Sequence, residues 1–449
     1  MKHLSQRTLG LYAIEATLLS AEERDHLAAC HDCQRALAGI QTFDSVLREP
    51  ETWVGLSDAA PRQTNDDLRA FAVRFAEEDA EALELLDEFK EPVAAARFVW
   101  AGIAAKPRFR TGGVARLLCR WANGMCERDP LYALKLAEVA TQISYALPDT
   151  SYPRNAIHEL RGEALKEQAN ALRFLGRLPA ALRAVTKSEL EYRRLPHENL
   201  GLAAVKYVRG CVHYEQDELD DAEAAAHDAA DASLRLGLAD TYMNARHLLG
   251  HVLFDRQEYA AAANVFEGIL RYGKAKGSVV WIARESLSAG GCYLELGRAA
   301  EARHHLDDAR RLFSEMGFLT EITRVDWAIA RLMFSEGNIP EAVHRLRRCI
   351  AELTSHEMLT EAAVVAVDLA EILHATSGPR EIAKVLANVV RTFMDAGKLT
   401  SVLTALAYLK DAATAGTVTP GLVAYVRRFV QRAERQPELL FVPPPPDPV

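Results

Sequence analysis

Small residues recur along this chain at a nearly constant spacing of 40 positions. Five alanines follow one another at steps of 41, 40, 40 and 40 residues: Ala181, Ala222, Ala262, Ala302 and Ala342. Twelve positions before each alanine stands another small residue: Ala169, Gly210, Gly250, Gly290 and Ala330. Self-similarity at a constant period marks stacked supersecondary units. We therefore expect a repeat array in which each unit packs mainly on its neighbours.

Two further positions complete the repeating unit. Five positions before each alanine there is usually a turn-forming residue: Gly176, Asp217, Gln257, Gly297 and Gly337. Four positions after it comes a mostly apolar residue: Val185, Ala226, Phe266, Leu306 and Leu346. Small residues on a first helix let a second helix approach closely, and the turn residue reverses the chain between them. The unit is predicted to be helix, turn, helix.

This pattern resembles the tetratricopeptide repeat, most clearly over Leu249–Phe266 and Gly290–Ala309. The resemblance implies an all-α fold, an α-solenoid of about eight helical hairpins. The period of 40 residues exceeds the usual 34, which predicts longer helices or longer turns between repeats. Segments such as Arg271–Gly277 and Arg311–Gly317 are candidates for these extensions.

The solenoid is expected to span residues 64–436, with its clearest repeats over 157–395. Upstream of these repeats, Val114–Cys126 and Pro130–Tyr145 are predicted to form another helix pair, and Asp129-Pro130 is a typical helix start. Asp66–Ala104 is expected to give two more helices, divided at Pro92.

Two segments have the composition of linkers. Residues 48–63 contain Glu-Pro-Glu-Thr-Trp and Pro-Arg-Gln-Thr-Asn, and we expect them to join the solenoid to a head of residues 1–47. Residues 437–449 end in a polyproline run and are predicted to be a disordered tail.

The head contains the one cluster of metal-ligand residue types in the sequence, His26-x3-Cys30-x2-Cys33. Ser20 and Glu23 form a capping box that predicts a helix start at Ala21. On this helix His26 and Cys30 share one face, and Cys33 falls one turn further, so three zinc ligands are expected to converge at its C-terminal end.

A fourth ligand must come from elsewhere. His3 is the natural candidate, because a preceding helix of about Leu4–Thr17 would run antiparallel and return its start to the metal. His31 is the rival, although a residue adjacent to Cys30 usually points away from it. A head of residues 1–47 is too small to build much of a core, so we expect a structural zinc ion to supply stability. The alternative is a redox-sensitive zinc site, since thiolate reactivity depends on exposure and local charge.

The head is similar to the zinc-containing anti-sigma domain of bacteria. The similarity includes Leu11-Tyr12, the Leu-Ser-x-Glu-Glu helix start, the HxxxCxxC motif and the residues up to Leu37, about a tenth of the chain. It implies Zn²⁺ on His3, His26, Cys30 and Cys33. It also implies a sigma factor of the extracytoplasmic-function type as partner.

The solenoid predicts a partner groove, since stacked hairpins form an extended surface lined by the first helix of each pair. The side chains expected there are basic and aromatic, which favours an acidic or C-terminal peptide as ligand. These candidate partner-binding residues are Lys166, Asn170, Arg173, Tyr207, Tyr214, Asn244, His247, His251, Phe254, Arg284, Arg324, Trp327, Arg331 and Phe334.

Composition narrows the class of protein. A net charge of −9 gives no overall attraction to nucleic acid or anionic lipid. The sequence has no apolar run long enough to span a membrane, and its start lacks the apolar core of a signal peptide. With seven scattered cysteines, an odd number, a reducing cytosolic location is expected rather than a disulfide framework.

The sequence also lacks the GxxxxGK[ST], GxGxxG, HExxH and GxSxG motifs, so we expect no enzymatic activity. Two hypotheses remain. In the first, the chain is a cytosolic regulator whose zinc head engages a transcription component such as a sigma factor while the groove binds another protein. In the second, it is an interaction scaffold in which the zinc head is only a structural staple or cap.

Overall fold

The computed structural model describes residues 19–38, 65–86, 106–126, 128–196, 199–356, 358–396, 400–435 and 439–444, with a few isolated positions before residue 19 and at 103–104. The predicted linker 48–63 lies outside the described residues. Two compact units are present, Met1–Ala171 and Leu172–Val449. Each is described by itself below as unit 1 and unit 2.

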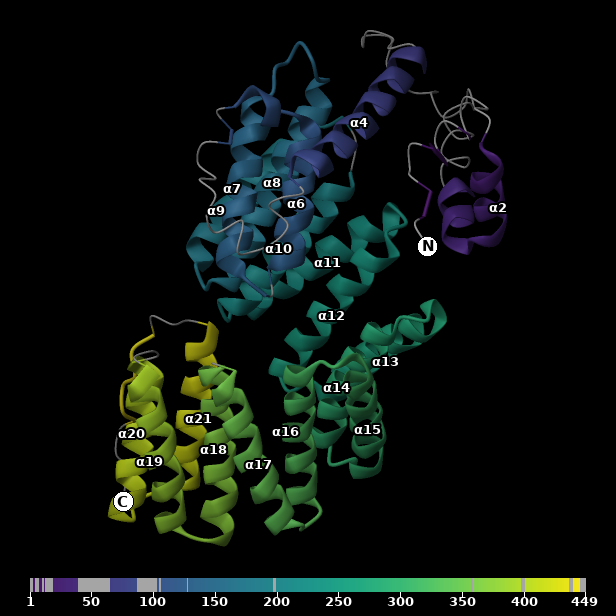
Figure 1. Ribbon diagram of the computed structural model, residues 1–449. Coiled ribbons are helices and arrows are strands. Elements are labelled where there is room, and N and C mark those ends of the chain that lie inside the picture. Colours follow the sequence, from purple (N-terminus) through teal and green to yellow (C-terminus); the bar gives the residue numbers. More distant parts are fainter. Residues whose placement is uncertain are drawn as a thin grey trace. The chain divides into compact units, whose positions relative to one another are not determined.

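Regular structure in the described part of the chain is helical (Figure 1). Unit 1 contains α2 (Ala21–Ala29), α4 (Asn65–Leu85), a 3₁₀ turn η4 (Pro107–Phe109), α6 (Gly112–Met125), α7 (Pro130–Ala146) and most of α8 (Arg154–Phe174). Unit 2 continues with α9 (Leu178–Tyr192), α10 (Leu200–Glu215), α11 (Leu219–Arg235), α12 (Ala239–Asp255), α13 (Tyr259–Lys276), α14 (Val279–Glu295) and α15 (Ala299–Met316). It ends with α16 (Leu319–Ser335), α17 (Ile339–Ser355), α18 (Leu359–Thr376), α19 (Pro379–Ala396), α20 (Thr400–Ala415) and α21 (Pro420–Arg435).

The helices from α6 to α21 form eight consecutive pairs, which confirms the predicted all-α solenoid of about eight hairpins. In unit 2, α10 to α18 each pack against the next helix along the chain. Figure 1 shows α16, α17 and α18 side by side. Helices of 17 or 18 residues, such as α12, α13 and α14, account for the long repeat period.

The predicted turn residues reverse the chain in a left-handed backbone conformation. Gly176, Gly297 and Gly337 have φ angles of 68°, 69° and 83°, and the non-glycine residues Asp217 and Gln257 both have φ of 65°. This conformation lets the chain bond back onto the helix it leaves, as when the Glu258 N–H donates to the Leu253 carbonyl at 2.9 Å. The sequence-based assignment of the turns is therefore confirmed.

The small residues on the first helices lie where a second helix comes close. A Cβ atom added to Gly250 would lie 2.5 Å from the Phe266 ring, and one added to Gly290 would lie 2.8 Å from the Leu306 side chain. Both contacts are too short for a Cβ atom in this packing, so a larger residue at either position would force the Phe266 ring or the Leu306 side chain to move.

Unit 1 also follows the sequence-based expectation. Asp129 caps α7 by accepting a hydrogen bond from the Tyr132 N–H at 2.9 Å, with Pro130 in the first turn. Helix α4 approaches the start of α6 closely, because a Cβ atom on Gly113 would lie 2.2 Å from the Glu78 carbonyl oxygen. Helix α4 corresponds to the first helix expected in Asp66–Ala104, whereas the division at Pro92 lies outside the described residues.

The C-terminal end departs from the expected disordered tail. Within it, the structure places Leu439–Pro444 against the last hairpin. The Phe441 ring lies 4.9 Å from the Phe429 ring, and the Tyr425 hydroxyl donates to the Val442 carbonyl at 2.7 Å. The expectation is thus wrong for these residues, since an aromatic anchor gives this part of the proline-rich segment apolar surface to bury.

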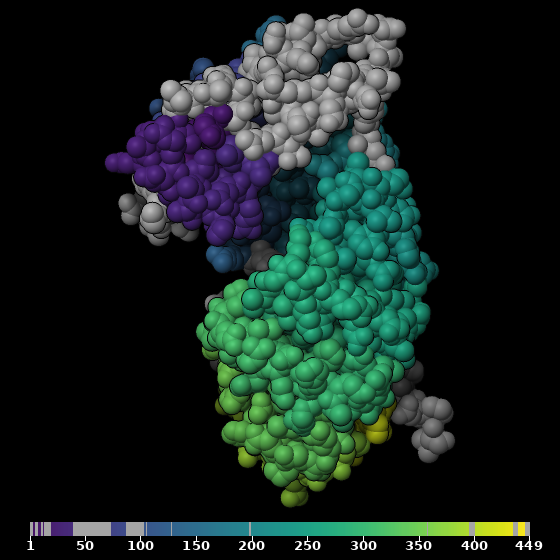
Figure 2. All heavy atoms as spheres, turned by 90° about the vertical axis from the view of Figure 1, so that its right-hand side faces the viewer, coloured from purple at the N-terminus to yellow at the C-terminus, as the bar shows by residue number. Residues whose placement is uncertain are grey.

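No described helix combines the length and the apolar character that a membrane span requires. In Figure 2 the atoms of the repeats coloured teal to green form a continuous surface, so side chains fill the spaces between the ribbons of unit 2. Its largest clusters of buried residues lie between the paired helices, as around Phe266, Leu306 and Phe313.

Gln257→Gly should raise the midpoint of chemical unfolding. A left-handed backbone costs a non-glycine residue about 1–2 kcal/mol, and glycine avoids this cost. The greater chain entropy that glycine loses on folding offsets only about 0.5–1 kcal/mol of the gain. Circular dichroism during urea unfolding would measure it. Gly297→Ala is the matched reverse change, since an added Cβ meets nothing within 4 Å there and only the backbone effect remains. A lower midpoint for Gln257→Gly would contradict this explanation of the turn.

Candidate functional site

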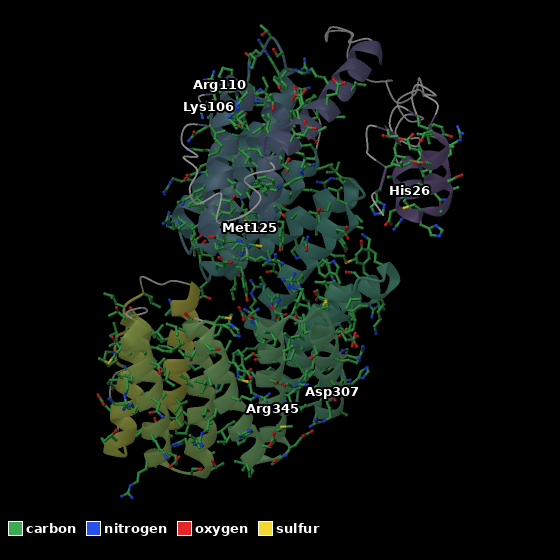
Figure 3. The ribbon with its side chains drawn as sticks, viewed as in Figure 1. His26, Lys106, Arg110, Met125, Asp307 and Arg345 are labelled. Atoms are coloured by element: carbon green, nitrogen blue, oxygen red, sulfur yellow. The ribbon has the colours of Figure 1, made fainter. Side chains whose placement is uncertain are left out.

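The four residues predicted to bind metal in the head come together in the structure. One ligand atom from each of His3, His26, Cys30 and Cys33 lies within 4.8 Å of the others. His3 Nδ1 is 3.3 Å from Cys30 Sγ and 3.7 Å from Cys33 Sγ, and His26 Nε2 is 3.4 Å from Cys33 Sγ. Figure 3 labels His26 on the head.

The local fold that presents these ligands differs in one respect from the expectation. The capping box is present, with the Glu23 N–H donating to Ser20 Oγ and the Ser20 N–H donating to the Glu23 carboxylate. However, α2 ends at Ala29, and Cys30 has an extended backbone with φ of −104° and ψ of 104°. A second helical stretch covers residues 31–38. The prediction that one helix carries all three ligands is therefore wrong.

The break at Cys30 has a physical consequence for the ligand set. It places Cys33 in the first turn of the next helical stretch, where its side chain is buried at 2% exposure, while His31 is exposed. Two short helices thus present ligands toward one point. The predicted antiparallel helix Leu4–Thr17 lies largely outside the described residues.

The spacing of the ligand atoms fits a tetrahedral zinc ion. With Zn–N of about 2.0–2.1 Å and Zn–S of about 2.3 Å, a tetrahedron has N···S edges of about 3.5–3.6 Å. The three N···S separations of 3.3, 3.4 and 3.7 Å bracket this value. The Leu4 N–H also points to Cys33 Sγ at 3.4 Å, a contact typical of the hydrogen bonds that support metal thiolates.

The two thiols have different environments. The backbone N–H of Cys33 lowers the pKa of the Cys30 thiol, whereas burial raises the pKa of the Cys33 thiol. A thiolate rather than a thiol is the metal ligand. Of the two, Cys33 therefore depends more on a cation to hold its ionised form.

The candidate partner-binding residues in unit 2 lie on the first helices of consecutive pairs. We call helices α10, α12, α14, α16, α18 and α20 the first-helix layer. In addition to their contacts within pairs, α10 packs against α12, α14 against α16, and α18 against α20. The predicted residues on α8 to α16 are half-buried, except for Arg284, which is exposed.

The basic side chains of this set are paired with acids from neighbouring helices. Arg173 forms an ion pair with Glu215. Arg324 contacts Glu361 at 2.6 Å, and Arg331 contacts Glu295 at 2.8 Å. These acids stand 36 to 42 residues from their partners in the sequence.

Sequence reasoning missed these acidic partners. Each acid lies about one repeat from its arginine in the sequence. This spacing could have identified the pairs, because residues one repeat apart occupy equivalent positions on neighbouring hairpins. The first-helix layer therefore carries arginines paired with carboxylates, whereas the sequence predicted a surface of basic and aromatic side chains.

Asp368 on α18 is the most enclosed of the acids near Arg331 and is 4% exposed. It accepts a hydrogen bond from Trp327 Nε1 at 2.8 Å and contacts Arg427 of α21 at 2.7 Å. Arg331 Nε is 3.7 Å away. One buried carboxylate thus links α16, α18 and α21.

The aromatic members of the set pack between repeats. Tyr207 and Tyr214 lie against a cluster that includes Cys211, Leu248 and Leu249. The Phe254 ring is 5.2 Å from the Tyr259 ring. Phe334 packs against the cluster of buried residues that runs from Ala330 to Ala433. His247 and His251 contact each other.

Lys166 and Asn170 belong to unit 1 and are therefore described apart from the others. The Lys166 ammonium contacts the buried Glu167 carboxylate at 2.7 Å, and Asn123 donates to the same carboxylate at 3.1 Å. This cluster ties α6 to α8. Asn244 of unit 2 is half-buried on α12.

Comparisons with known proteins identify solved structures with a similar fold. No protein-family model matches the chain, and no curated protein sequence is significantly similar to it. The crystal structure of aspartyl phosphate phosphatase F from Bacillus subtilis is similar, with 11% identity and a TM-score of 0.51 over 88% of this chain and 95% of that chain. This likeness shows a shared helical-repeat fold.

Two other solved structures have lower TM-scores. The Rap conjugation gene regulator of the plasmid pLS20 in complex with the Phr* peptide has 14% identity and a TM-score of 0.45, over 97% of this chain and 99% of that chain. The apo form of RapI has 16% identity and a TM-score of 0.44, over 60% of this chain and 99% of that chain.

Asp368→Ala should destabilise unit 2 by roughly 2–4 kcal/mol, because it removes a buried carboxylate that faces Arg331 and Arg427 and leaves the Trp327 indole N–H without its acceptor. Urea unfolding followed by circular dichroism would measure it. Glu381→Ala is the control, since Glu381 is 41% exposed in its pair with Arg347 and should matter by less than about 0.5 kcal/mol. Equal effects of the two changes would refute the linking role of Asp368.

Proposed function

We propose that this chain is a non-enzymatic cytosolic regulator that binds a segment of a partner protein along the first-helix layer and carries a head stabilised by one structural Zn²⁺ ion. The observation that carries the binding function is the continuous series of half-buried aromatic and charged side chains on consecutive first helices. Such side chains are enriched at protein interfaces and at their energetic hot spots.

The donor set of the head supports zinc. Two imidazoles and two thiols are a common structural zinc set, and the N···S separations match a tetrahedron. His3, His26, Cys30 and Cys33 would hold the ion. Once bound, it would fix the two short helices that carry these ligands, a role suited to a head with few buried residues.

The charges of the candidate partner-binding residues refine the nature of the ligand. Because Arg173, Arg324 and Arg331 contact carboxylates, an acidic ligand would have to compete for them. Arg284 is the most exposed of the candidate cations, and we propose that a ligand carboxylate contacts it. We therefore propose a peptide segment with one acidic group and apolar or aromatic anchors, rather than a strongly acidic one.

The partner of the head follows from its resemblance to the anti-sigma zinc domain. We propose a transcription component, such as a sigma factor, as the protein that the head engages. In the alternative function, an interaction scaffold, the zinc head is only a staple and the partner depends on the first-helix layer alone.

Zinc analysis of the purified full chain should give one Zn²⁺ equivalent in the unmodified protein and close to none in Cys30→Ser/Cys33→Ser, because two of four ligands are lost. His3→Ala should weaken retention against a chelator. His31→Ala is the matched control and should retain zinc, since its side chain is exposed. Equal zinc content in the unmodified chain and the double variant would end the zinc proposal.

Co-purification of partners with the full chain should depend on Arg284. Arg284→Glu should weaken binding of the solenoid partner by about tenfold or more, or about 1.4 kcal/mol. Arg271→Glu reverses a charge that is 73% exposed on the second helix α13, and should leave binding unchanged. Equal affinity of both variants would remove the first-helix layer as the binding surface.

The same experiment separates the two functions of the head. A sigma factor or other transcription component that co-purifies with the unmodified chain and not with Cys30→Ser/Cys33→Ser would support the regulator. If every partner is retained by that double variant, the head has no partner of its own and the scaffold function stands.

A further inference from the structure

Two histidines of the first-helix layer face each other across one turn of α12. His247 and His251 are four residues apart and thus lie on the same side of the helix. Their Nε2 atoms are 3.1 Å apart, with the ring planes inclined by 79°. Two imidazole nitrogens this close must either share a proton or coordinate one ion.

A fully buried carboxylate stands behind this pair. Glu285 of α14 is 0% exposed, and its Oε1 lies 2.8 Å from His247 Nδ1. Neither carboxylate oxygen nor His247 Nδ1 has a hydrogen bond of standard geometry, so the close imidazole is the polar group that faces this buried acid. A buried charge is costly unless a cation or a metal-bound group faces it.

The carboxylate favours one tautomer of His247. A carboxylate oxygen only accepts, so its position 2.8 Å from Nδ1 favours the neutral imidazole with the proton on Nδ1 and the Nε2 lone pair free to bind an ion. In protein metal sites, a carboxylate commonly contacts the ring nitrogen of a histidine that does not bind the metal. The carboxylate fixes the orientation of the ring and makes it a more basic ligand.

From these contacts we propose that His247 and His251 form a second metal site, in unit 2, for a divalent ion that favours imidazole, such as Zn²⁺. Two nitrogens at about 2.0–2.1 Å from a tetrahedral ion are about 3.3–3.4 Å apart, so the pair needs only a small rotation of its rings. Imidazole ligands suit Zn²⁺, Ni²⁺ and Cu²⁺.

The surroundings support coordination. The Phe266 ring lies 5.8 Å from His247 and 5.2 Å from His251, and the Trp281 ring lies 6.3 Å from His247. This apolar shell limits the movement of both rings and excludes water from one side. The His247 side chain is 24% exposed, which leaves room for water or a ligand group to complete the coordination.

The site is independent of the head, whereas His247 and His251 belong to the candidate partner-binding residues, so a bound ion would lie on the proposed binding surface. Its ligands come from one helix and its supporting carboxylate from the next first helix, so a bound ion would join two neighbouring repeats. Failure of this inference would leave the head zinc and the binding function untouched, since their tests measure other residues.

Isothermal titration with Zn²⁺ tests the site in the full chain carrying His26→Ala/Cys30→Ser/Cys33→Ser, which removes the head donors. This parent protein should bind one Zn²⁺, and native mass spectrometry should count one ion. Adding His251→Ala should abolish that binding. Adding Glu285→Gln should weaken it by about 10–100-fold, the usual effect of losing such an outer contact.

His304→Ala is the matched control. His304 is 72% exposed on α15 next to His305, and its loss should leave the Zn²⁺ affinity unchanged. If His251→Ala does not fold, as judged by circular dichroism, His251→Phe keeps a ring of similar size and removes the nitrogen. Absence of binding in the parent protein would mean that the two rings share a proton instead, and equal binding after the His251 change would place the ion elsewhere. Either result would overturn the proposal.

Discussion

The close approach of paired helices at their small residues is the constraint on which this solenoid depends. Gly250 against Phe266 and Gly290 against Leu306 leave no space for a Cβ atom. Because a glycine or an alanine recurs at this position at each step of about 40 residues, every hairpin is held to a similar helix separation. The first helices are thereby brought close enough for their side chains to meet across repeats.

That proximity explains why charge on the first-helix layer is paired. Long side chains such as Arg324 and Arg331 reach carboxylates on a neighbouring first helix, and His247 reaches Glu285 in the same way. Half-buried charges are costly when alone, so each repeat satisfies its neighbour. Binding of a ligand on this layer would consequently exchange existing contacts as well as make new ones.

The head differs from the solenoid in how few of its described residues are buried. Helix α2 has no fully buried residue, so packing alone holds it weakly. Four possible ligand atoms lie within 4.8 Å of one another. An ion bound there would supply the stability that this head does not gain from a hydrophobic core. The break in helix at Cys30 is part of this arrangement, because it directs Cys33 inward while His31 stays in solvent.

The sequence by itself determined the repeat period, the turn positions, the capping box and the His26, Cys30 and Cys33 motif of the head, since each depends on residues close together or at a fixed offset. Only the tertiary structure decided the acidic partners of the arginines, the carboxylate behind His247, the break at Cys30 and the docking of Phe441. The physical reason is distance along the chain. Periodicity and caps act within a few turns of helix, whereas a charge on one hairpin finds its partner on the next only after the hairpins have packed.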